Sequence, residues 1–346
     1  MWLLTNDTPF AAERTWVRDE NGAEVWIVAV KGSFVIEGNG RPVLSPEQSE
    51  VARVPKFRGD PANTSLLFES DLIHKKTRTD VIVHGHAFAP GGRPTTKVDV
   101  RLKVANIDKT LRVQGDRVVE GGFIGVTASS PEPFVQMPIT YERSFGGTDQ
   151  KDENPKRHAW EPSNPVGVGF GTRMQHVIGT PAPNVEYPNS PYRDCGRGKP
   201  AGFGPVARHW NPRAKFAGTY DQRWEEERLP LLPLDFDERF YQCAPEDQQT
   251  DGFLRGGEVV ELFNMTPDGY LAFELPRVWL VLSTQLGAQR IDHRPNLHTV
   301  ILEPDVPQVT LVWHSSLPCH GKETKLYQTV VRQKQYVSLS GHAHAA

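Results

Sequence analysis

The sequence predicts a mainly β protein, in which antiparallel, sandwich-like β-sheets carry a long irregular central layer and only a few short helices. Several apolar runs of strand length are bounded by turn residues, and one of them alternates strictly between apolar and polar side chains. The 346 residues include 30 glycines and 29 prolines, which implies many turns. With 38% hydrophobic residues, the chain is also able to bury a substantial core.

Residues 1–140 form the first predicted β region. Residues 26–36 and 79–89 are rich in β-branched and apolar side chains, and each run is followed by a turn that contains glycine. In residues 98–104, valine or leucine occupies every second position and a charged residue each position between. Because successive side chains of a strand point to opposite faces, we expect this strand to have one buried and one solvent-exposed face.

Residues 251–346 form a second predicted β region. The runs 258–265 and 270–275 flank Pro267-Asp268-Gly269. This tripeptide predicts a hairpin, because proline presets φ and glycine accepts a positive φ. The other expected elements are a central strand at 278–282, a strand at 309–313 and, at 325–339, either a short helix or a final strand.

Residues 141–250 differ in composition from both β regions. Residues 144–212 contain 10 glycines and 10 prolines, a content typical of linkers, but linkers are poor in aromatic residues. This segment contains seven: Phe145, Trp160, Phe170, Tyr187, Tyr192, Phe203 and Trp210. We therefore expect an ordered irregular layer that packs with residues 1–140 and 251–346 into one compact unit. One helix is expected at 223–229, where Thr219 and Gln222 form a capping box and Pro230 ends the helix.

Composition also limits the partners. The formal net charge is -3, with acidic and basic residues interspersed, so no strong field favours nucleic acid. No apolar stretch is long enough to insert into a membrane, and the N-terminus lacks the pattern of a secretory signal, so we expect a cytoplasmic protein. The three cysteines, Cys195, Cys243 and Cys319, are distant in sequence, and we expect free thiols.

The histidines do not match a metal-binding signature. His84 and His86 lie two residues apart on an expected strand, where both imidazoles would share one face, but the sequence places no third or fourth ligand beside them. Satisfied structural histidines are the simpler interpretation, although a metal at this pair stays open. The same interpretation holds for the other candidates, which are His293, His298, His314 and His320, the last two flanking Cys319. We expect no cofactor.

No motif predicts an enzyme. Ser144, after an expected strand at 135–142, precedes a glycine pair able to present backbone amides to an anion, but a tight turn in which a carboxylate holds Arg143 explains it as well. The glycine-rich segments 167–171 and 196–200 lack the spacing of phosphate loops. A carboxylate pair of a glycosidase is the alternative, because four acidic residues lie near aromatic residues that could stack on sugars: Glu142, Glu186, Asp194 and Asp221. With 42 acidic residues in the chain, coincidence is the simpler explanation.

The strongest signal for function is the density of Trp, Tyr, Phe and Arg in residues 202–249. Such side chains dominate protein interfaces because they bury large areas at low entropic cost. An equally simple explanation is that these rings pin the irregular layer to the sheets. The residues that we expect to contact a partner are Arg143, Phe145, Phe203, Trp210, Tyr220, Trp224, Phe236 and Phe240.

These motifs resemble a bacterial family of formerly unknown function that is encoded beside type VI secretion genes. The resemblance rests on 202–249, on 141–147 (Tyr-Glu-Arg-Ser-Phe-Gly-Gly) and on 164–169 (Asn-Pro-Val-Gly-Val-Gly). Shorter segments near both ends also fit: 6–10, 30–34, 268–269 and 311–313. The resemblance implies a cytoplasmic chaperone or adaptor that binds a toxic effector, keeps it soluble and helps to load it onto a PAAR-type spike tip or the VgrG trimer. It implies no catalytic residues.

Overall fold

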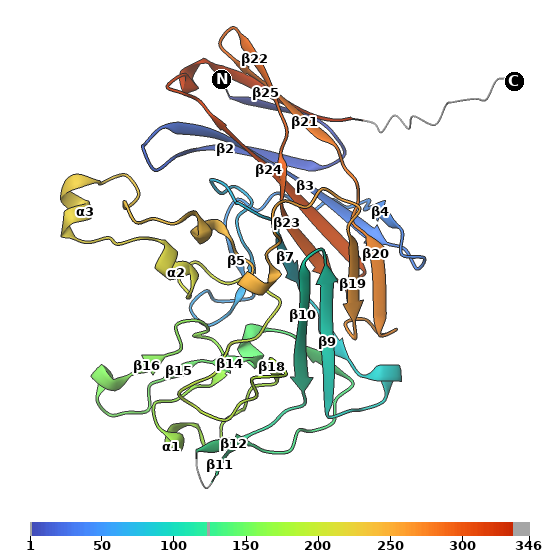
Figure 1. The fold of residues 1–346 in the computed structure, drawn as a ribbon, viewed down its shortest axis with the longest axis vertical. Coiled ribbons are helices and arrows are strands. Elements are labelled where there is room, and N and C mark those ends of the chain that lie inside the picture. Colours follow the sequence, from blue (N-terminus) through green and yellow to red (C-terminus); the bar gives the residue numbers. More distant parts are fainter. Residues whose placement is uncertain (1, 123–124, 335–346) are drawn as a thin grey trace, which may run out of the picture.

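The computed structural model describes residues 2–122 and 125–334 and shows a mainly β protein with three larger sheets (Figure 1). The predicted fold class is therefore confirmed. One continuous core of buried side chains includes residues from the N-terminal, central and C-terminal parts of the chain. None of the helices within the described residues has the length and apolarity needed to cross a membrane.

A six-stranded sheet forms the centre of the molecule, in the order β2-β3-β24-β23-β7, with β4 paired to β3. All side chains at positions 25–34 of β3 are buried, because both faces of this strand are covered. On one face Trp26 Nε1 donates a hydrogen bond to Thr329 Oγ1 of another sheet at 2.9 Å, and on the opposite face Lys31 Nζ contacts Asp71 Oδ2 at 3.0 Å. The strands are β2 (Ala11–Arg18), β3 (Glu24–Ile36), β4 (Pro42–Leu44), β7 (Asp80–Val83), β23 (Asn296–Glu303) and β24 (Gln308–Pro318).

A four-stranded sheet packs against one end of the central sheet, in the order β1-β25-β21-β22 (Figure 1). Strand β25 decides between the helix and the strand expected at 325–339 in favour of a strand. Thr329 and Val331, two positions apart, both point into the core, as they do on one face of a strand. Residues 335–339 of that range lie outside the described residues. The strands are β1 (Leu3–Asp7), β21 (Leu280–Leu286), β22 (Gln289–His293) and β25 (Leu326–Gln333).

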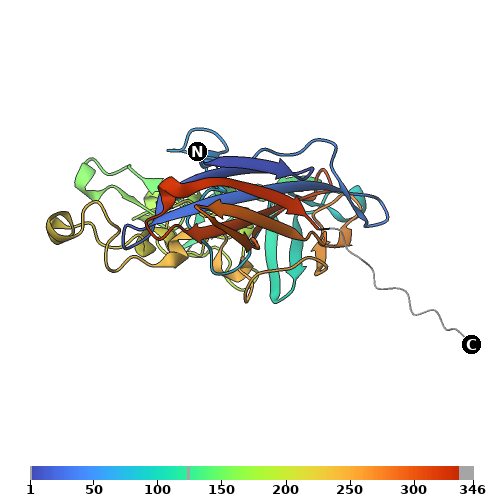
Figure 2. The same ribbon diagram turned by 90° about the horizontal axis from the view of Figure 1, so that it is seen from above.

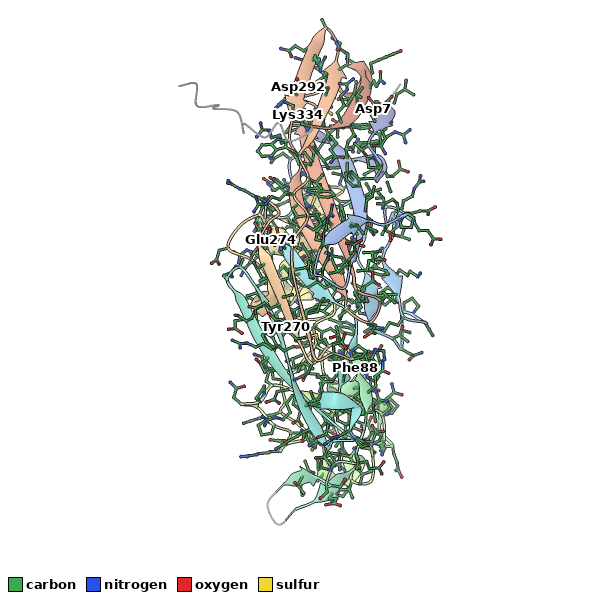
Figure 3. The ribbon with its side chains drawn as sticks, turned by 90° about the vertical axis from the view of Figure 1, so that its right-hand side faces the viewer. Asp7, Phe88, Tyr270, Glu274, Asp292 and Lys334 are labelled. Atoms are coloured by element: carbon green, nitrogen blue, oxygen red, sulfur yellow. The ribbon has the colours of Figure 1, made fainter. Side chains whose placement is uncertain are left out.

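A five-stranded sheet, in the order β18-β10-β9-β19-β20, covers the rest of the core. The alternation predicted at 98–104 is confirmed in β9, whose four apolar side chains are at most 4% exposed. The predicted hairpin is also confirmed, since Phe263 pairs with Tyr270 and Gly269 has a φ of 78° in the turn. The strands are β9 (Lys97–Val104), β10 (Ile107–Gln114), β18 (Val185–Glu186), β19 (Val259–Phe263) and β20 (Tyr270–Glu274). Figure 3 shows Tyr270 and Glu274 on the side of the molecule to the right in Figure 1.

The prediction of one continuous strand at 79–89 is wrong. It is divided at Gly85, where a Cβ atom would lie 2.9 Å from Pro304 Cγ, so the chain passes close to the turn after β23 and leaves the sheet. The part before Gly85 is β7, which pairs with β23, whereas the part after it is β8 (His86–Phe88), which pairs with β13 (Gln136–Pro138). The strand predicted at 135–142 is likewise reduced to β13, followed by the 3-10 helix η2 (Tyr141–Arg143).

Residues 141–250 form an irregular layer of short ribbons and turns. The remaining two-stranded ribbons of the molecule are β5 (Lys56–Phe57) with β6 (Leu66–Phe68), β11 (Val119–Gly121) with β12 (Val126–Ala128), β14 (Phe145–Gly146) with β17 (Val168–Gly169), and β15 (Thr148–Asp149) with β16 (Ala159–Trp160). The α-helices are α1 (Met174–Val177), α2 (Arg213–Phe216) and α3 (Gln222–Glu227). The other 3-10 helices are η1 (Pro90–Gly92), η3 (Pro155–Arg157), η4 (Glu238–Tyr241), η5 (Glu246–Gln248) and η6 (Glu323–Lys325).

Helix α3 is the helix predicted near 223–229, but its cap is not the predicted one. The Asp221 side chain accepts the hydrogen bond of the Trp224 N–H at 2.9 Å and so caps the first turn. Thr219 instead donates to Asp235 through its N–H and its hydroxyl, at 2.9 and 2.7 Å. An extended aspartate directly before the first helical residue satisfies the free backbone donors of the first turn, so the upstream threonine is not needed there.

Candidate functional site: an exposed arm on the irregular layer

Three of the aromatic residues expected to contact a partner are part of the core. Phe145, Phe203 and Trp210 are 3%, 1% and 1% exposed. The Trp210 ring packs edge-on against Tyr141 at 5.7 Å between centroids, and a Cβ atom on Gly198 would lie 2.3 Å from the Phe145 ring. The prediction that these three residues contact a partner is corrected, because close packing around the rings leaves no free surface. The rings instead hold the irregular layer in place.

Arg143 lines a polar cleft of about 590 Å³. Its Nη1 donates to Asp116 Oδ1 at 2.9 Å and to Asn184 Oδ1 at 3.2 Å, so a carboxylate holds this side chain in place. The described lining includes no aromatic residue and consists of Asp116, Arg117, Val118, Ser129, Ser130, Glu132, Glu142, Arg143, Val168, Pro181, Ala182 and Asn184.

The residues considered for catalysis are each occupied by a structural contact. Ser144 is fully buried, and its Oγ accepts the Ala201 N–H at 2.6 Å. The glycines of the 146–147 and 167–171 segments allow close backbone packing, since a Cβ on Gly146 would lie 2.1 Å from the Asn164 carbonyl oxygen. The four carboxylates accept hydrogen bonds from four different places: Glu142 from Ser65, Glu186 from Arg117, Asp194 from Gly196 and Asp221 from Trp224.

The paired histidines contact different partners. His84 Nδ1 lies 3.3 Å from Arg58 Nη2, and its ring packs edge-on against Phe68. Burial first, and then the Arg58 charge, lowers the pKa of His84 to about 4. His86 Nδ1 lies 2.7 Å from Asp305 Oδ2. Within residues 2–122 and 125–334, no group of three potential ligands surrounds a metal position.

The remaining histidine candidates also have structural surroundings. His293 lies between the hydroxyls of Thr284 and Ser315, at 2.9 and 2.6 Å. His298 and His314 stack at 4.4 Å between ring centroids inside the core. His320 follows the buried Cys319 in a turn with a φ of 51°. All three cysteines are free and buried.

Because His314 is buried, we expect the fold to lose stability in acid. Burial lowers the pKa of His314 to about 3, whereas the unfolded value is about 6.5, so in acid the unfolded chain binds a proton that the folded chain does not. The stability contribution is complete above about pH 6.5 and is lost as the pH falls towards 3. In a His314→Gln variant, whose amide replaces the Nε2 contact to the Ile73 carbonyl at 2.8 Å, this loss is absent. Denaturant unfolding measures the free energy of unfolding at pH 7 and at pH 5. Between these two pH values, it should fall by about 2 kcal/mol more in the natural chain than in the His314→Gln variant. Equal decreases would contradict the prediction.

Residues 217–237 of the irregular layer form an exposed arm. Its base is closed where the Asp237 N–H donates to the Phe216 carbonyl at 3.0 Å. The arm contains α3, which lies away from the three larger sheets in both views (Figure 1; Figure 2, yellow helix). It touches the sheets at the turn between β2 and β3, where Arg228 Nη2 donates to the Glu20 carbonyl at 2.7 Å and Leu231 packs against Gly22.

Three large apolar side chains of the arm are open to solvent. Tyr220 is 53%, Leu229 59% and Leu234 76% exposed. Beside them is a groove of about 160 Å³, lined in part by Trp224, Pro233 and Leu234. Isolated exposed apolar residues are ordinary, but a cluster on one projecting element marks an interaction surface.

The other expected contact residues stabilise this arm. Trp224 is half-buried, donates from Nε1 to the Leu231 carbonyl at 2.8 Å and packs edge-on against Tyr220 at 4.7 Å. Phe236 and Phe240 are half-buried and pack together at 5.6 Å at the base. Tyr220 is therefore the expected residue that is most available to a partner.

The density of aromatic residues did not identify Leu229 or Leu234. Both belong to the sequence Leu-Pro-Leu-Leu-Pro-Leu at 229–234. Two prolines in six residues exclude a regular helix or a central strand, so its leucines cannot all share one buried face. That pattern is the signal by which the exposed leucines could have been found.

Comparison with protein families gives a match over most of the chain. The model of a family described as "Uncharacterized protein conserved in bacteria (DUF2169)" matches residues 21–314, a range that includes the whole arm. Comparisons with curated proteins and with solved structures gave no match.

Proposed function

This chain belongs to that bacterial family of uncharacterized proteins, and we propose that it is an adaptor that acts by binding other proteins. The observation that supports the proposal is the arm, which presents Tyr220, Leu229 and Leu234 to solvent on a projecting element. Side chains of this kind exclude water when a partner covers them, and this provides affinity without chemistry.

The partners that we propose are a toxic effector of a type VI secretion system and a spike protein, either a PAAR-type tip or VgrG. The support is the resemblance of residues 141–147, 164–169 and 202–249 to proteins encoded with such systems. In this proposal the adaptor covers an apolar segment of the effector in the cytoplasm and releases it when the effector docks on the spike. Binding and release by exchange of contacts need no nucleotide.

The proposal predicts that arm variants lose the effector. Replacing Leu229 and Leu234 by serine removes two exposed apolar contacts, each worth about 1.5–3 kcal/mol when it is fully buried. We expect the double variant to recover at least 10-fold less of the effector encoded beside it in co-purification. Its unfolding midpoint should remain unchanged, because surface substitutions of this type alter stability little.

The matched control also introduces two serines, in place of Leu44 on β4 and Val259 on β19. These side chains are 43% and 54% exposed. These strands lie on the other side of the molecule from α3 (Figure 1). Control and natural chain should recover equal amounts of effector. If the natural chain neither forms a complex with the effector or a spike protein nor changes the solubility of the effector, the proposed function is wrong.

A further inference from the structure

The arm carries a concentrated negative charge. Residues 217–237 contain six acidic and two basic residues, which gives 2 − 6 = −4, whereas the whole chain has a formal net charge of -3. The remainder of the chain is thus close to neutral, so the arm carries the net negative charge of the chain. Fields of this type raise the rate of encounter with positively charged partners.

Both basic residues of the arm are engaged within the chain. Arg223 Nε contacts Glu227 Oε2 at 3.0 Å. Arg228 donates to the Leu232 carbonyl at 3.0 and 3.2 Å as well as to the turn before β3. The guanidinium groups are therefore already used and do not balance the other carboxylates of the arm.

Two carboxylates on α3 stay available. Glu225 and Glu226 are exposed, and within the described part of the chain no basic side chain forms an ion pair with either of them. The contact made by Glu226 is with the neutral amide of Gln222 at 2.9 Å. By contrast, Asp221 caps the helix and Asp235 accepts two hydrogen bonds from Thr219.

The carboxylates of Glu225 and Glu226 belong to the same arm as the exposed apolar side chains. Leu229 lies two residues beyond Glu227, the last residue of α3, and its N–H donates to the Trp224 carbonyl at 3.0 Å, so this exposed leucine adjoins the end of the helix that carries both glutamates. The Tyr220 ring, just before α3, packs edge-on against the ring of Trp224 in the first turn of the helix. A partner that covers the leucines also meets the two carboxylates.

We propose that the arm binds a cationic amphipathic segment of a partner protein, whose lysines or arginines face Glu225 and Glu226 and whose apolar residues cover Leu229, Leu234 and Tyr220. This inference rests on the proposed function and specifies the chemistry of the bound segment. The sign of the charge favours such a segment over an anionic membrane surface or a nucleic acid, both of which the arm would repel.

Two synthetic peptides test the inference. Both have 18 residues with leucine at the same helical positions, and the positions between are lysine in one and glutamate in the other. We expect fluorescence anisotropy to give at least about 10-fold tighter binding of the lysine peptide, with an affinity that falls between 50 and 300 mM NaCl as charge pairs are screened. Equal affinity for both peptides, or binding to vesicles of phosphatidylglycerol, would overturn the inference.

Charge variants locate the contact. Glu225→Gln with Glu226→Gln should weaken binding of the lysine peptide about 5-fold and reduce its salt dependence, since two charge pairs are removed. Glu47→Gln with Glu50→Gln removes the same charge from exposed positions between β4 and β5 and should leave the affinity unchanged. Equal weakening by both double variants would show that only net charge matters and would overturn the inference.

The same variants separate this inference from the proposed function. If the natural chain binds the effector and the Glu225→Gln/Glu226→Gln variant binds it equally well, the cationic segment is wrong and the adaptor function stands. If the lysine peptide binds as expected but no effector or spike protein forms a complex, the chemistry of the arm stands and the adaptor function fails.

Discussion

Replacement of Trp210 by alanine is expected to lower the free energy of unfolding by about 3–5 kcal/mol, the range found when large aromatic side chains are removed from a core. Trp210 is 1% exposed and packs with Tyr141, Val206 and Ala207 in a buried cluster within the irregular layer. The alanine variant leaves a cavity that the surrounding ribbons fill only in part. Equilibrium unfolding in urea, followed by tryptophan fluorescence and circular dichroism, measures the difference.

The control is Tyr220→Ala in the same central region. Tyr220 is 53% exposed, so its removal should change stability by less than about 0.5 kcal/mol and act on partner binding instead. If Trp210→Ala has the stability of the natural chain and loses only the partner, then Trp210 is a contact residue, and the role given to it here is wrong.

The second large effect is expected from Asp80→Ala. Lys76 and Asp80 are 3% and 0% exposed, and Lys76 Nζ lies 2.5 Å from Asp80 Oδ2. Asp80 also accepts the Cys243 N–H at 2.7 Å and a Gln242 amide hydrogen bond at 2.9 Å. Removing the carboxylate leaves a buried ammonium without its counter-charge, which costs about 3–5 kcal/mol.

The pH dependence gives this prediction a second measurement. Burial acts to lower the pKa of Lys76, but the attraction of Asp80 outweighs it and the net pKa is raised. Without Asp80, burial prevails and the folded pKa falls below the unfolded value of about 10.4. The stability deficit of Asp80→Ala should therefore shrink as the pH rises from 7 towards 10. A deficit that is constant over this range would contradict the explanation.

A surface pair provides the matched control for Asp80→Ala. Arg101 and Asp108 also lie 2.5 Å apart, but their side chains are 42% and 50% exposed. Exposed ion pairs contribute between 0 and about 1 kcal/mol, so Asp108→Ala should have a small effect at any pH between 7 and 10.

Periodicity made the regular strands predictable. In β9 the alternation of valine and leucine with charged residues specifies which side chains enter the core, and the pairing of β19 with β20 follows from the turn at 267–269. Both signals are local, because they depend on the pleat of one strand and on the φ values of one turn.

The break at Gly85 and the final strand β25 depended on residues far away in sequence. Gly85 passes Pro304, which is distant in the chain, and β25 is a strand because β1 and β21 pair with it on either side. No local pattern contains these partners. A sequence whose spacing fits both helix and strand is decided by the hydrogen-bonding partners that the fold supplies.

The sequence by itself therefore determined the β architecture and the presence of an ordered aromatic-rich layer. Only the tertiary structure decided that Phe145, Phe203 and Trp210 are core and that Tyr220, Leu229 and Leu234 are surface. The physical reason is that an irregular segment has no repeating face. Whether one of its side chains is covered depends on which distant residues pack over it, and composition does not contain that information.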